Sequence, residues 1–375
     1  MARLLPLFLV GLVLRPQIVG IGPLLPEVQD SLDISHGVAG LLPTIPVLCM
    51  GVFAPLAPPM LRRYGSRLAV GASLALVGLV GVVRALVPGA PLVLLFTVPL
   101  GVGIAIAGTL LPVVVKEEYP ERPALGTGLY TTGINVGATI AAVAAAPLAV
   151  VAGWRGTLVA YSAASALFVL PWLWRTHAPA APPERAPLPW RSTVAMAIAA
   201  TFALQSILFY GFNAWLADAY TERGWSDTSA GGLVAVMNGV ALVVGIGAAV
   251  TADRTGSRRS FLLVASALAV AGAVLIAADV AGAWAWTALL GAAMGVLFTI
   301  VMTLPLDAAR ERSEIAALST LMLGAGYSIS ALAPVALGAV RDASGSFTLP
   351  LALLAGDAVL LFAVAAFTAP ARAVR

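Results

Sequence analysis

Long apolar runs dominate the chain, and only short polar or glycine- and proline-containing breaks separate them. Most runs are about 20 residues long, the length that an α-helix needs to cross the hydrocarbon core of a bilayer. The pattern predicts an all-α membrane protein with twelve transmembrane helices, at residues 4–26, 37–60, 68–87, 91–115, 124–150, 155–174, 192–216, 229–251, 260–278, 283–306, 315–340 and 348–368.

Composition points to lipid as the solvent of this chain. Of its 375 residues, 60% are hydrophobic and 10% are charged, whereas a soluble domain carries roughly 25% charged residues. Tryptophan favours the headgroup level of a bilayer, and we interpret the tryptophans as an aromatic belt. All eight fall at or just beyond the end of a predicted span: Trp154, Trp172, Trp174, Trp190, Trp215, Trp225, Trp284 and Trp286.

The net charge of +4 indicates topology rather than a nucleic-acid partner. Sixteen of the 21 lysines and arginines lie on loops that share a side with both termini, four lie on the other side, and Arg15 lies within a span. Positively charged loops remain in the cytoplasm. We therefore expect a multi-pass protein of the bacterial cytoplasmic (inner) membrane with both termini cytoplasmic, and no nucleic-acid partner.

Several classes of site find no support in the residues. Cys49 is the only cysteine, and His36 and His177 are far apart in sequence, so we expect no metal site and no cofactor. The chain lacks a Gly-x-x-x-x-Gly-Lys-Ser/Thr phosphate loop, which argues against transport driven by ATP hydrolysis at a site within this chain. No serine, histidine and acid arrangement indicates an enzyme. We expect a monomer, and we interpret the N-terminal apolar run as an uncleaved first span, although it is similar to a signal peptide.

A proline-rich stretch divides the chain. Residues 175–191 contain five prolines, which forbid a continuous helix. We predict a cytoplasmic linker there, between an N-terminal six-helix bundle at residues 1–174 and a C-terminal six-helix bundle at residues 192–375.

The two halves are related by an internal repeat. Two matches lie 191 residues apart: Arg63-Tyr64-Gly65-Ser66-Arg67 with Arg254-Thr255-Gly256-Ser257-Arg258, and Ser35-x-x-x-Ala39-Gly40 with Ser226-x-x-x-Ala230-Gly231. Two more lie 193 residues apart: Pro112 with Pro305, and Gly133 with Gly326. A duplicated six-helix unit is typical of secondary transporters, which place the substrate site near the middle of the membrane.

Twelve spans, a central linker and repeated basic turns after spans 2 and 8 resemble the major facilitator superfamily. The family's turn signature is a glycine, a spacer, Asp-Arg, one residue, Gly and then basic residues. The second half carries Gly247 followed by Asp253-Arg254-Thr255-Gly256-Ser257-Arg258-Arg259, and the first half has Arg62 at the acidic position. The resemblance implies that these turns latch helix ends in the outward-open state. The implied latch residues are Arg63, Gly65, Arg67, Asp253, Arg254, Gly256 and Arg258.

A narrower resemblance covers most of the first half. Leu14-Arg15-Pro16 with Ile21-Gly22-Pro23-Leu24-Leu25-Pro26 is similar to the first helix of the cyanate and 2-nitroimidazole transporter branch. Leu110-Leu111-Pro112 with Val115-Lys116, and Thr127-Gly128-Leu129-Tyr130-Thr131, are similar to the same branch. Val13 and Gly108 stand where the branch often has asparagine. The resemblance implies a small anion or a compact heterocycle as the substrate.

Arg15 lies halfway along the apolar first span, where a cation costs at least about 2.5–3.5 kcal/mol. We predict that it contacts the substrate; the alternative is a structural arginine that pairs with a neighbouring helix. Arginine suits a small planar anion because it stays charged and offers a fork of donors, and it also suits the acceptors of a neutral nitro-heterocycle. Gly11 and Gly22 share its helical face, and they either leave room for the side chain or permit close helix packing.

Prolines predict two weak points in the first span. Pro16 lacks an N–H, so it should loosen the helix around the carbonyl of Leu12, and Gly22-Pro23 adds a second break. Broken helices in transporters expose backbone groups to the substrate or act as gating hinges. A tolerated kink is the alternative for both.

Other intramembrane polar groups are candidate substrate contacts. Ser206, Tyr210 and Asn213 share one face of span 7, which lines the pathway in the family that the chain resembles. Tyr130, Asn238 and Tyr327 lie on spans 5, 8 and 11. For each of these the alternative is a bond to a neighbouring helix.

Two further polar residues are expected to lie away from the substrate. Gln17 is two positions from Arg15 and therefore points elsewhere. Arg84 is one turn from the end of span 3, so we expect its side chain to snorkel to the interface, and a functional role is the alternative.

Three groups are candidates for coupling transport to protons. Asp357 is the only acid well inside a span, and an intramembrane carboxylate can carry a proton. Glu27 and His36 lie at the outer ends of spans 1 and 2. Span 12 is peripheral in the family that the chain resembles, so a role outside coupling is the alternative for Asp357.

We therefore expect a secondary active transporter that moves a small organic or inorganic anion similar to cyanate, by alternating access of two halves. One alternative is an exporter of a compact neutral heterocycle or drug-like compound, similar to 2-nitroimidazole. Another is a membrane receptor or sensor that binds its ligand without moving it.

Overall fold

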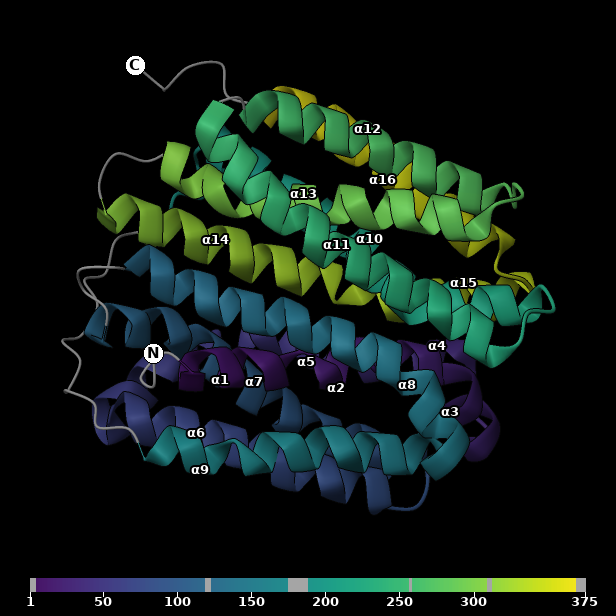
Figure 1. Cartoon of the computed structure of the whole chain (residues 1–375), viewed down its shortest axis with the longest axis horizontal. Coiled ribbons are helices and arrows are strands. Elements are labelled where there is room, and N and C mark those ends of the chain that lie inside the picture. The colour runs from purple at the N-terminus through teal and green to yellow at the C-terminus, as the bar shows by residue number, and fades with distance from the viewer. Residues whose placement is uncertain (1–4, 119–122, 175–187, 256–257, 309–311, 369–375) are drawn as a thin grey trace. The chain divides into compact units, whose positions relative to one another are not determined.

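The computed structural model describes residues 5–118, 123–174, 188–255, 258–308 and 312–368, and across these residues it is helical, without a strand (Figure 1). Among these residues, ten helical segments are long and apolar enough to cross a membrane. The predicted all-α membrane fold is therefore confirmed. The chain divides into two compact units, residues 1–183 and 184–375. Their boundary falls in the predicted linker, but residues 175–187 lie outside the described residues, so the linker stays a prediction.

The N-terminal unit consists of helices joined by short turns. Its elements are α1 (Leu5–Leu14), α2 (Pro16–Val19), η1 (Gly22–Leu24), α3 (Leu25–Leu32), α4 (His36–Ala39), α5 (Leu41–Val52), η2 (Ala54–Leu56), α6 (Ala57–Leu86), α7 (Ala90–Glu118), α8 (Pro123–Leu167) and α9 (Val169–Leu173). Both α6 and α8 contain a break, at Gly65 with φ 71° and at Gly153 with φ 67°. Glycine adopts this left-handed backbone readily because it has no Cβ. Each of the two glycines therefore marks a turn between two spans.

These breaks reconcile the helices with the twelve predicted spans. The apolar stretch Leu129–Leu173 is 45 residues long, about 68 Å at 1.5 Å per residue, and Gly153 divides it into spans 5 and 6. Span 2 corresponds to a shorter apolar stretch, His36–Val52. With these two assignments, each of the twelve predicted spans has a helical counterpart among the described residues.

The C-terminal unit contains α10 (Thr193–Glu222), α11 (Asp227–Thr255), α12 (Arg258–Ala277), α13 (Ala283–Ala308), α14 (Arg312–Ser330), α15 (Leu332–Ser344) and α16 (Thr348–Thr368). The predicted end of span 7 at residue 216 is wrong, because α10 continues to Glu222. Its last turns are not a polar tail, since Tyr220 is 2% exposed.

Local geometry supports the internal repeat. Ser35 Oγ accepts a hydrogen bond from Val38 N at 3.3 Å, and Ser226 Oγ accepts one from Ser229 N at 3.3 Å. A serine in this position caps the start of a helix by satisfying an N–H that has no helical partner. The two serines that match in sequence therefore perform the same local task in the two units.

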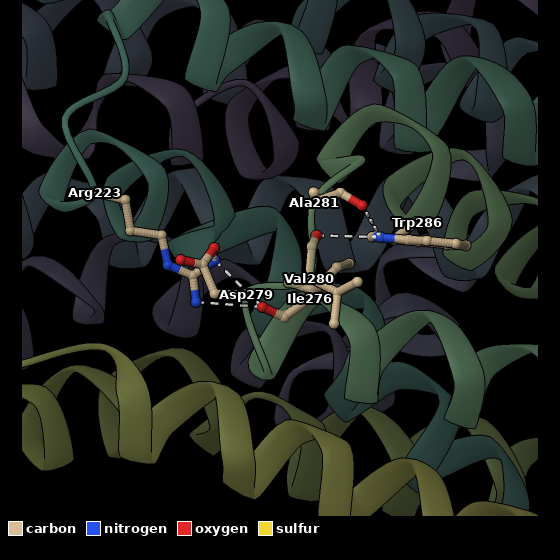
Figure 2. A network of polar contacts seen from close by, with 6 residues as sticks. All are labelled: Arg223, Ile276, Asp279, Val280, Ala281 and Trp286. Atoms are coloured by element: carbon tan, nitrogen blue, oxygen red, sulfur yellow. Dashed lines mark hydrogen bonds and ion pairs between the residues drawn. The ribbon is translucent and has the colours of Figure 1, made fainter.

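Polar contacts close the end of α12 in the C-terminal unit. Figure 2 shows Arg223, whose Nη1 and Nη2 both donate to Ile276 O at 3.2 Å and whose Nη1 pairs with Asp279 Oδ1 at 2.9 Å. Trp286 Nε1 donates to the carbonyls of residues 280 and 281, at 3.2 and 3.0 Å. Arg223 thus adds a partner to a carbonyl in the last turn of α12, where a positive charge is favourable, and Trp286 bonds the carbonyls of the turn that follows.

Three tryptophans depart from the predicted aromatic belt. Trp154, Trp172 and Trp215 are at most 3% exposed. Trp172 Nε1 donates to Arg67 O at 2.8 Å, and Trp215 Nε1 donates to Pro334 O at 2.7 Å. The belt interpretation is wrong for these three rings, because they are buried, and two of them bond backbone carbonyls.

Candidate functional site

Arg15 lies at a break in the first span rather than inside a continuous helix. α1 ends at Leu14, and α2 begins at Pro16. The carbonyl of Arg15 accepts hydrogen bonds from Ile18 N at 2.9 Å and from Val19 N at 3.0 Å, which starts α2. Arg15 is only 8% exposed, so nearly all of this cationic residue is enclosed.

Pro16 explains this break in physical terms. Without an N–H, it cannot bond the carbonyl of Leu12, one helical turn earlier. Gly137 of α8 packs directly over that residue, since a Cβ on Gly137 would lie 2.7 Å from the carbonyl carbon of Leu12. A Cβ on Gly11 would lie 3.0 Å from Ile134 N, also in α8. Of the two alternatives for Gly11, the structure therefore supports close helix packing.

The second predicted weak point is also a break. Gly22-Pro23 lies in the 3-10 turn η1, and α3 begins at Leu25. Both residues are buried. Figure 1 shows the first span as the short successive pieces α1, α2 and α3. The breaks at Pro16 and Gly22-Pro23 are confirmed, and their role in gating stays a prediction.

A chain of buried polar groups runs from Arg84 to the backbone of α8. Arg84 Nη2 donates to Gln17 Oε1 at 2.7 Å, and Gln17 Nε2 donates to Ser162 Oγ at 2.9 Å. Ser162 Oγ in turn donates to Leu158 O at 2.6 Å. All three side chains are 0% exposed. The prediction that Arg84 snorkels is wrong, because α2 and α8 cover the last turn of α6. The side chain of Gln17, on α2, points at Arg84.

The sequence holds a signal for this burial that depends on spacing. Gly78, Gly81 and Arg84 recur every three residues and therefore share a face of α6. A Cβ on Gly78 would lie 2.7 Å from Ala166 N, and one on Gly81 would lie 3.0 Å from Ser162 Cβ. Small residues let two helices approach closely. An arginine that follows them on the same face is covered by the neighbouring helix.

Two glutamates occupy equivalent positions in the two units. Glu27 Oε1 accepts a hydrogen bond from Trp154 N at 3.1 Å, and Glu222 Oε1 accepts one from Phe347 N at 3.1 Å. Each carboxylate thus caps the start of a helix, where negative charge is favourable. Glu222 also pairs with Arg341 at 2.9 Å. The sequence analysis missed Glu222, and the coupling role of Glu27 stays a prediction beside its capping contact.

The other two coupling candidates lie in different units. His36 is half-buried and begins α4, directly after the capping serine. Asp357 is half-buried on α16, and its Oδ2 atom is enclosed without a hydrogen-bond partner among the described residues. Within the part of the chain that the structure describes, no group of three or more His, Cys, Asp or Glu side chains could hold a metal ion.

The C-terminal unit brings two of the predicted amides together. Asn238 Nδ2 on α11 donates to Asn213 Oδ1 on α10 at 2.8 Å and to Val234 O at 2.9 Å. Asn213 Nδ2 donates to Phe209 O at 2.8 Å. Asn213 and Asn238 are 3% and 4% exposed. The pair links two helices, the alternative that sequence reasoning left open for buried amides.

Aromatic rings gather on the neighbouring part of α10. Tyr327 of α14 meets Phe202 edge to face with 5.1 Å between ring centroids, and it lies 6.5 Å from Tyr210. Ser206 is 3% exposed on the same helix. The structure thus places Ser206, Tyr210 and Tyr327 in one region of the C-terminal unit. Tyr130 lies half-buried on α8 of the N-terminal unit.

The predicted latch is partly described. Gly65 forms the turn, and Arg67 Nη2 donates to Leu173 O at the end of α9. Arg63 stays exposed, with its guanidinium 5.4 Å from the ring of Tyr64. Arg258 begins α12. The side chains of Asp253 and Arg254, and residue Gly256, lie outside the described residues, so the latch stays a prediction.

Comparison with known families and proteins gives a consistent result. The family model described as Major Facilitator Superfamily matches residues 7–334. The cyanate transport protein CynX of Escherichia coli is 28% identical, over 98% of this chain and 97% of its own length. The 2-nitroimidazole transporter of the same organism is 27% identical, over 96% and 93%. The uncharacterized transporter YycB of Bacillus subtilis is 28% identical, over 93% and 88%.

Solved structures show the same fold. A bacterial homolog of the human lysosomal transporter Spinster, in an inward-facing and unoccupied conformation, matches with a TM-score of 0.78 and 16% identity, over 98% of this chain and 95% of its own. The D-xylose-proton symporter matches with a TM-score of 0.78 and 14% identity, over 97% and 96%.

Proposed function

Because the chain belongs to the Major Facilitator Superfamily, we propose that this membrane transporter is a secondary active transporter of a small organic or inorganic anion, similar to cyanate. It works by alternating access of two six-helix halves, residues 1–174 and 192–375, joined by a cytoplasmic linker. It is a monomer in a bacterial cytoplasmic membrane, with both termini cytoplasmic, as the distribution of its basic residues favours.

Arg15 is the observation that carries this proposal. It combines a permanent positive charge, 8% exposure and a position at a helix break, where the backbone departs from regular bonding. A guanidinium recognises a small anion through charge and through parallel N–H donors. The 28% identity to a protein named as a cyanate transport protein agrees with this substrate class.

The remaining contacts of the proposed pathway are weaker candidates. Ser206, Tyr210, Asn213, Asn238 and Tyr327 supply hydroxyl, phenol and amide groups from the C-terminal unit. Tyr130 supplies a phenol from the N-terminal unit. These groups orient a solute without neutralising its charge. Arg15 supplies the positive charge that neutralises the anion.

A second candidate substrate is a compact neutral heterocycle that is exported, similar to 2-nitroimidazole. The cluster of Phe202, Tyr210 and Tyr327 favours it, since aromatic edges and faces suit a planar ring. A relative named as a 2-nitroimidazole transporter is 27% identical. In this case Arg15 donates to the acceptors of the ring rather than to an anion.

Transport by purified protein in liposomes distinguishes these candidates. We expect exchange of labelled cyanate that is lost in Arg15→Gln and retained in Arg191→Gln, whose exposed side chain lies on the turn before α10. If the protein exchanges no anion in a panel of small anions but moves 2-nitroimidazole, the second candidate substrate replaces the first. Binding of either compound without movement would indicate a receptor.

Protons are the proposed coupling ion, and Asp357, Glu27 and His36 are the proposed carriers. A solved structure of the same fold is named as a proton symporter. Asp357 is the more enclosed of the two carboxylates, with Oδ2 buried on α16. Coupling predicts that an imposed pH gradient drives the solute, whereas facilitated diffusion is indifferent to it.

A further inference from the structure

The middle piece of the first span, α2, depends on its surroundings for its position. It has four residues, from Pro16 to Val19, and helix breaks lie at both of its ends. A helix of this length is not stable by itself. At its start, Ile18 N and Val19 N donate to Arg15 O at 2.9 and 3.0 Å. Wherever the surrounding helices hold α2, the backbone of Arg15 is therefore held with it.

The side chain of Gln17 anchors α2 to two other helices. Its Oε1 atom accepts from Arg84 Nη2 on α6 at 2.7 Å, and its Nε2 atom donates to Ser162 Oγ on α8 at 2.9 Å. All three side chains are 0% exposed. Gln17 is two positions from Arg15, which is about 200° around a helix. The anchoring side chain and that of Arg15 therefore leave this turn in different directions.

A second contact packs the end of α2 against α8. Gly20 directly follows α2, and a Cβ there would lie 2.6 Å from Tyr161 Cε2. Tyr161 Oη donates to Ala141 O at 2.8 Å, so the ring is fixed between the two parts of α8 on either side of Gly153. Of the two attachments of α2, the one through Gln17 is directional, because it consists of hydrogen bonds.

The cost of burying Arg84 indicates that it does more than stabilise the fold. Its Nε and Nη1 atoms are buried and donate to no atom of the described residues. A buried cation whose described partner is a neutral amide is expensive. Apolar residues in place of both Arg84 and Gln17 would be nearly neutral for stability, because neither would leave a partner unbonded. The best-attested use of such buried polar groups is to fix one register among several.

We propose that Arg84 is a positioning residue: through Gln17 it holds α2 in the register that presents Arg15 to the transported anion. The inference rests on the proposed role of Arg15. Arg84 does not touch the anion itself, since it is 0% exposed and its one bonded donor, Nη2, is directed at Gln17. A binding residue needs such support, because a small displacement of its side chain loses the hydrogen bonds to the ligand.

Replacing both partners together separates positioning from stability. The protein with Gln17→Leu and Arg84→Met loses the anchor, while Ser162 Oγ keeps its bond to Leu158 O at 2.6 Å. We expect this double variant to unfold within about 2–4 °C of the natural protein. It should bind labelled cyanate about 10-fold more weakly, a loss typical of removing a group that orients a ligand-binding residue. A double variant that fails to fold overturns the proposal, because Arg84 then serves stability.

Two further variants show whether Arg84 acts through Arg15. Arg84→Lys keeps a donor for Gln17 Oε1, so it should bind cyanate as the natural protein does. In the Arg15→Gln background, the double replacement should cost no further affinity, because no guanidinium remains to be positioned. Losses that multiply overturn the proposal, since independent residues behave that way. Arg223→Gln is the matched control, because it removes a partly buried cation from the C-terminal unit, and its cyanate affinity should be unchanged.

Hydrogen exchange of the full-length protein without ligand, in detergent, separates this test from the identity of the substrate. Because Ile18 N and Val19 N bond Arg15 O, their exchange reports the order of this turn. It should be about 5- to 10-fold faster in the double variant, which loses about one net hydrogen bond, and unchanged in Arg84→Lys. Faster exchange in a protein that binds no cyanate would refute the proposed substrate and still support the positioning. Unchanged exchange in the double variant overturns the positioning, whatever the substrate.

Discussion

The bond between Asn213 and Asn238 predicts an unusual pattern of stability in which two substitutions together do less harm than one. Asn238→Leu removes a side chain that donates to Asn213 Oδ1 at 2.8 Å and to Val234 O at 2.9 Å. It leaves the buried oxygen of Asn213 without a donor. Asn213→Leu is milder, because Asn238 Nδ2 keeps Val234 O as a partner.

The magnitudes follow from burial and from the membrane setting. A buried acceptor that loses its donor costs about 1–3 kcal/mol in water-soluble proteins, and interhelical hydrogen bonds in membranes average about 0.6 kcal/mol with a maximum near 1.7. We expect Asn238→Leu to lower the free energy of unfolding by about 1–2 kcal/mol and Asn213→Leu by about 0.5–1 kcal/mol. The double variant pairs leucine with leucine, so its loss should be about 0–1 kcal/mol.

Thermal unfolding of the four proteins in one detergent measures this cycle. A unit of this size should shift by about 2–4 °C for each kcal/mol, so Asn238→Leu should unfold several degrees below the double variant. Losses that simply add in the double variant would refute the reasoning, because independent side chains behave that way. The double variant has a further use, since a stable protein that has lost cyanate exchange would assign the two amides to the substrate.

Three further predictions concern the carboxylate caps, the closest helix contact and the proposed coupling. Glu222→Gln should destabilise the protein by about 1–2 kcal/mol, because it loses the ion pair with Arg341 and the charge of the cap. Glu27→Gln should cost about half as much, because the described residues give Glu27 a cap contact without an ion pair. Equal unfolding temperatures of the two variants would contradict this. Gly137→Ala should lower the free energy of unfolding by about 1–3 kcal/mol, because the added Cβ drives α8 away from Leu12. A Cβ at position 108 would meet no atom within 4 Å, so the Gly108→Ala protein should unfold at or above the temperature of the natural protein. Asp357→Asn should abolish the response of cyanate uptake to an imposed pH gradient while exchange without a gradient continues, and an unchanged response would remove Asp357 as the proton carrier.

Much of the fold could be predicted because its causes are local. A span of about 20 apolar residues can be recognised from the run of apolar residues alone. Pro16 lacks a donor wherever it stands, so the break in the first span follows from one residue. Ser35 and Ser226 cap helices through bonds to residues three positions later, which is why matched sequence produced matched geometry.

The contents of the site were harder to predict because they depend on contacts between distant segments. Arg84 looked like a residue near a span end, and its burial depends on α2 and α8, which lie far from it in sequence. Glu222 looked like a loop acid, and it bonds a backbone N–H of residue 347. Trp215 sat at a predicted boundary because α10 was expected to end six residues too early. In each case the missing information was which helix covers the residue.

The central claim is that Arg15 holds the transported anion, and equilibrium binding tests it without the complications of transport. Binding of labelled cyanate should be measured on detergent-purified natural protein, on Arg15→Gln and on Arg191→Gln. A charge-assisted hydrogen bond contributes about 1.5–3 kcal/mol, so Arg15→Gln should bind cyanate about 10- to 150-fold more weakly. Arg191→Gln should bind as the natural protein does. Cyanate binding by a folded Arg15→Gln protein with the affinity of the natural protein would contradict the account.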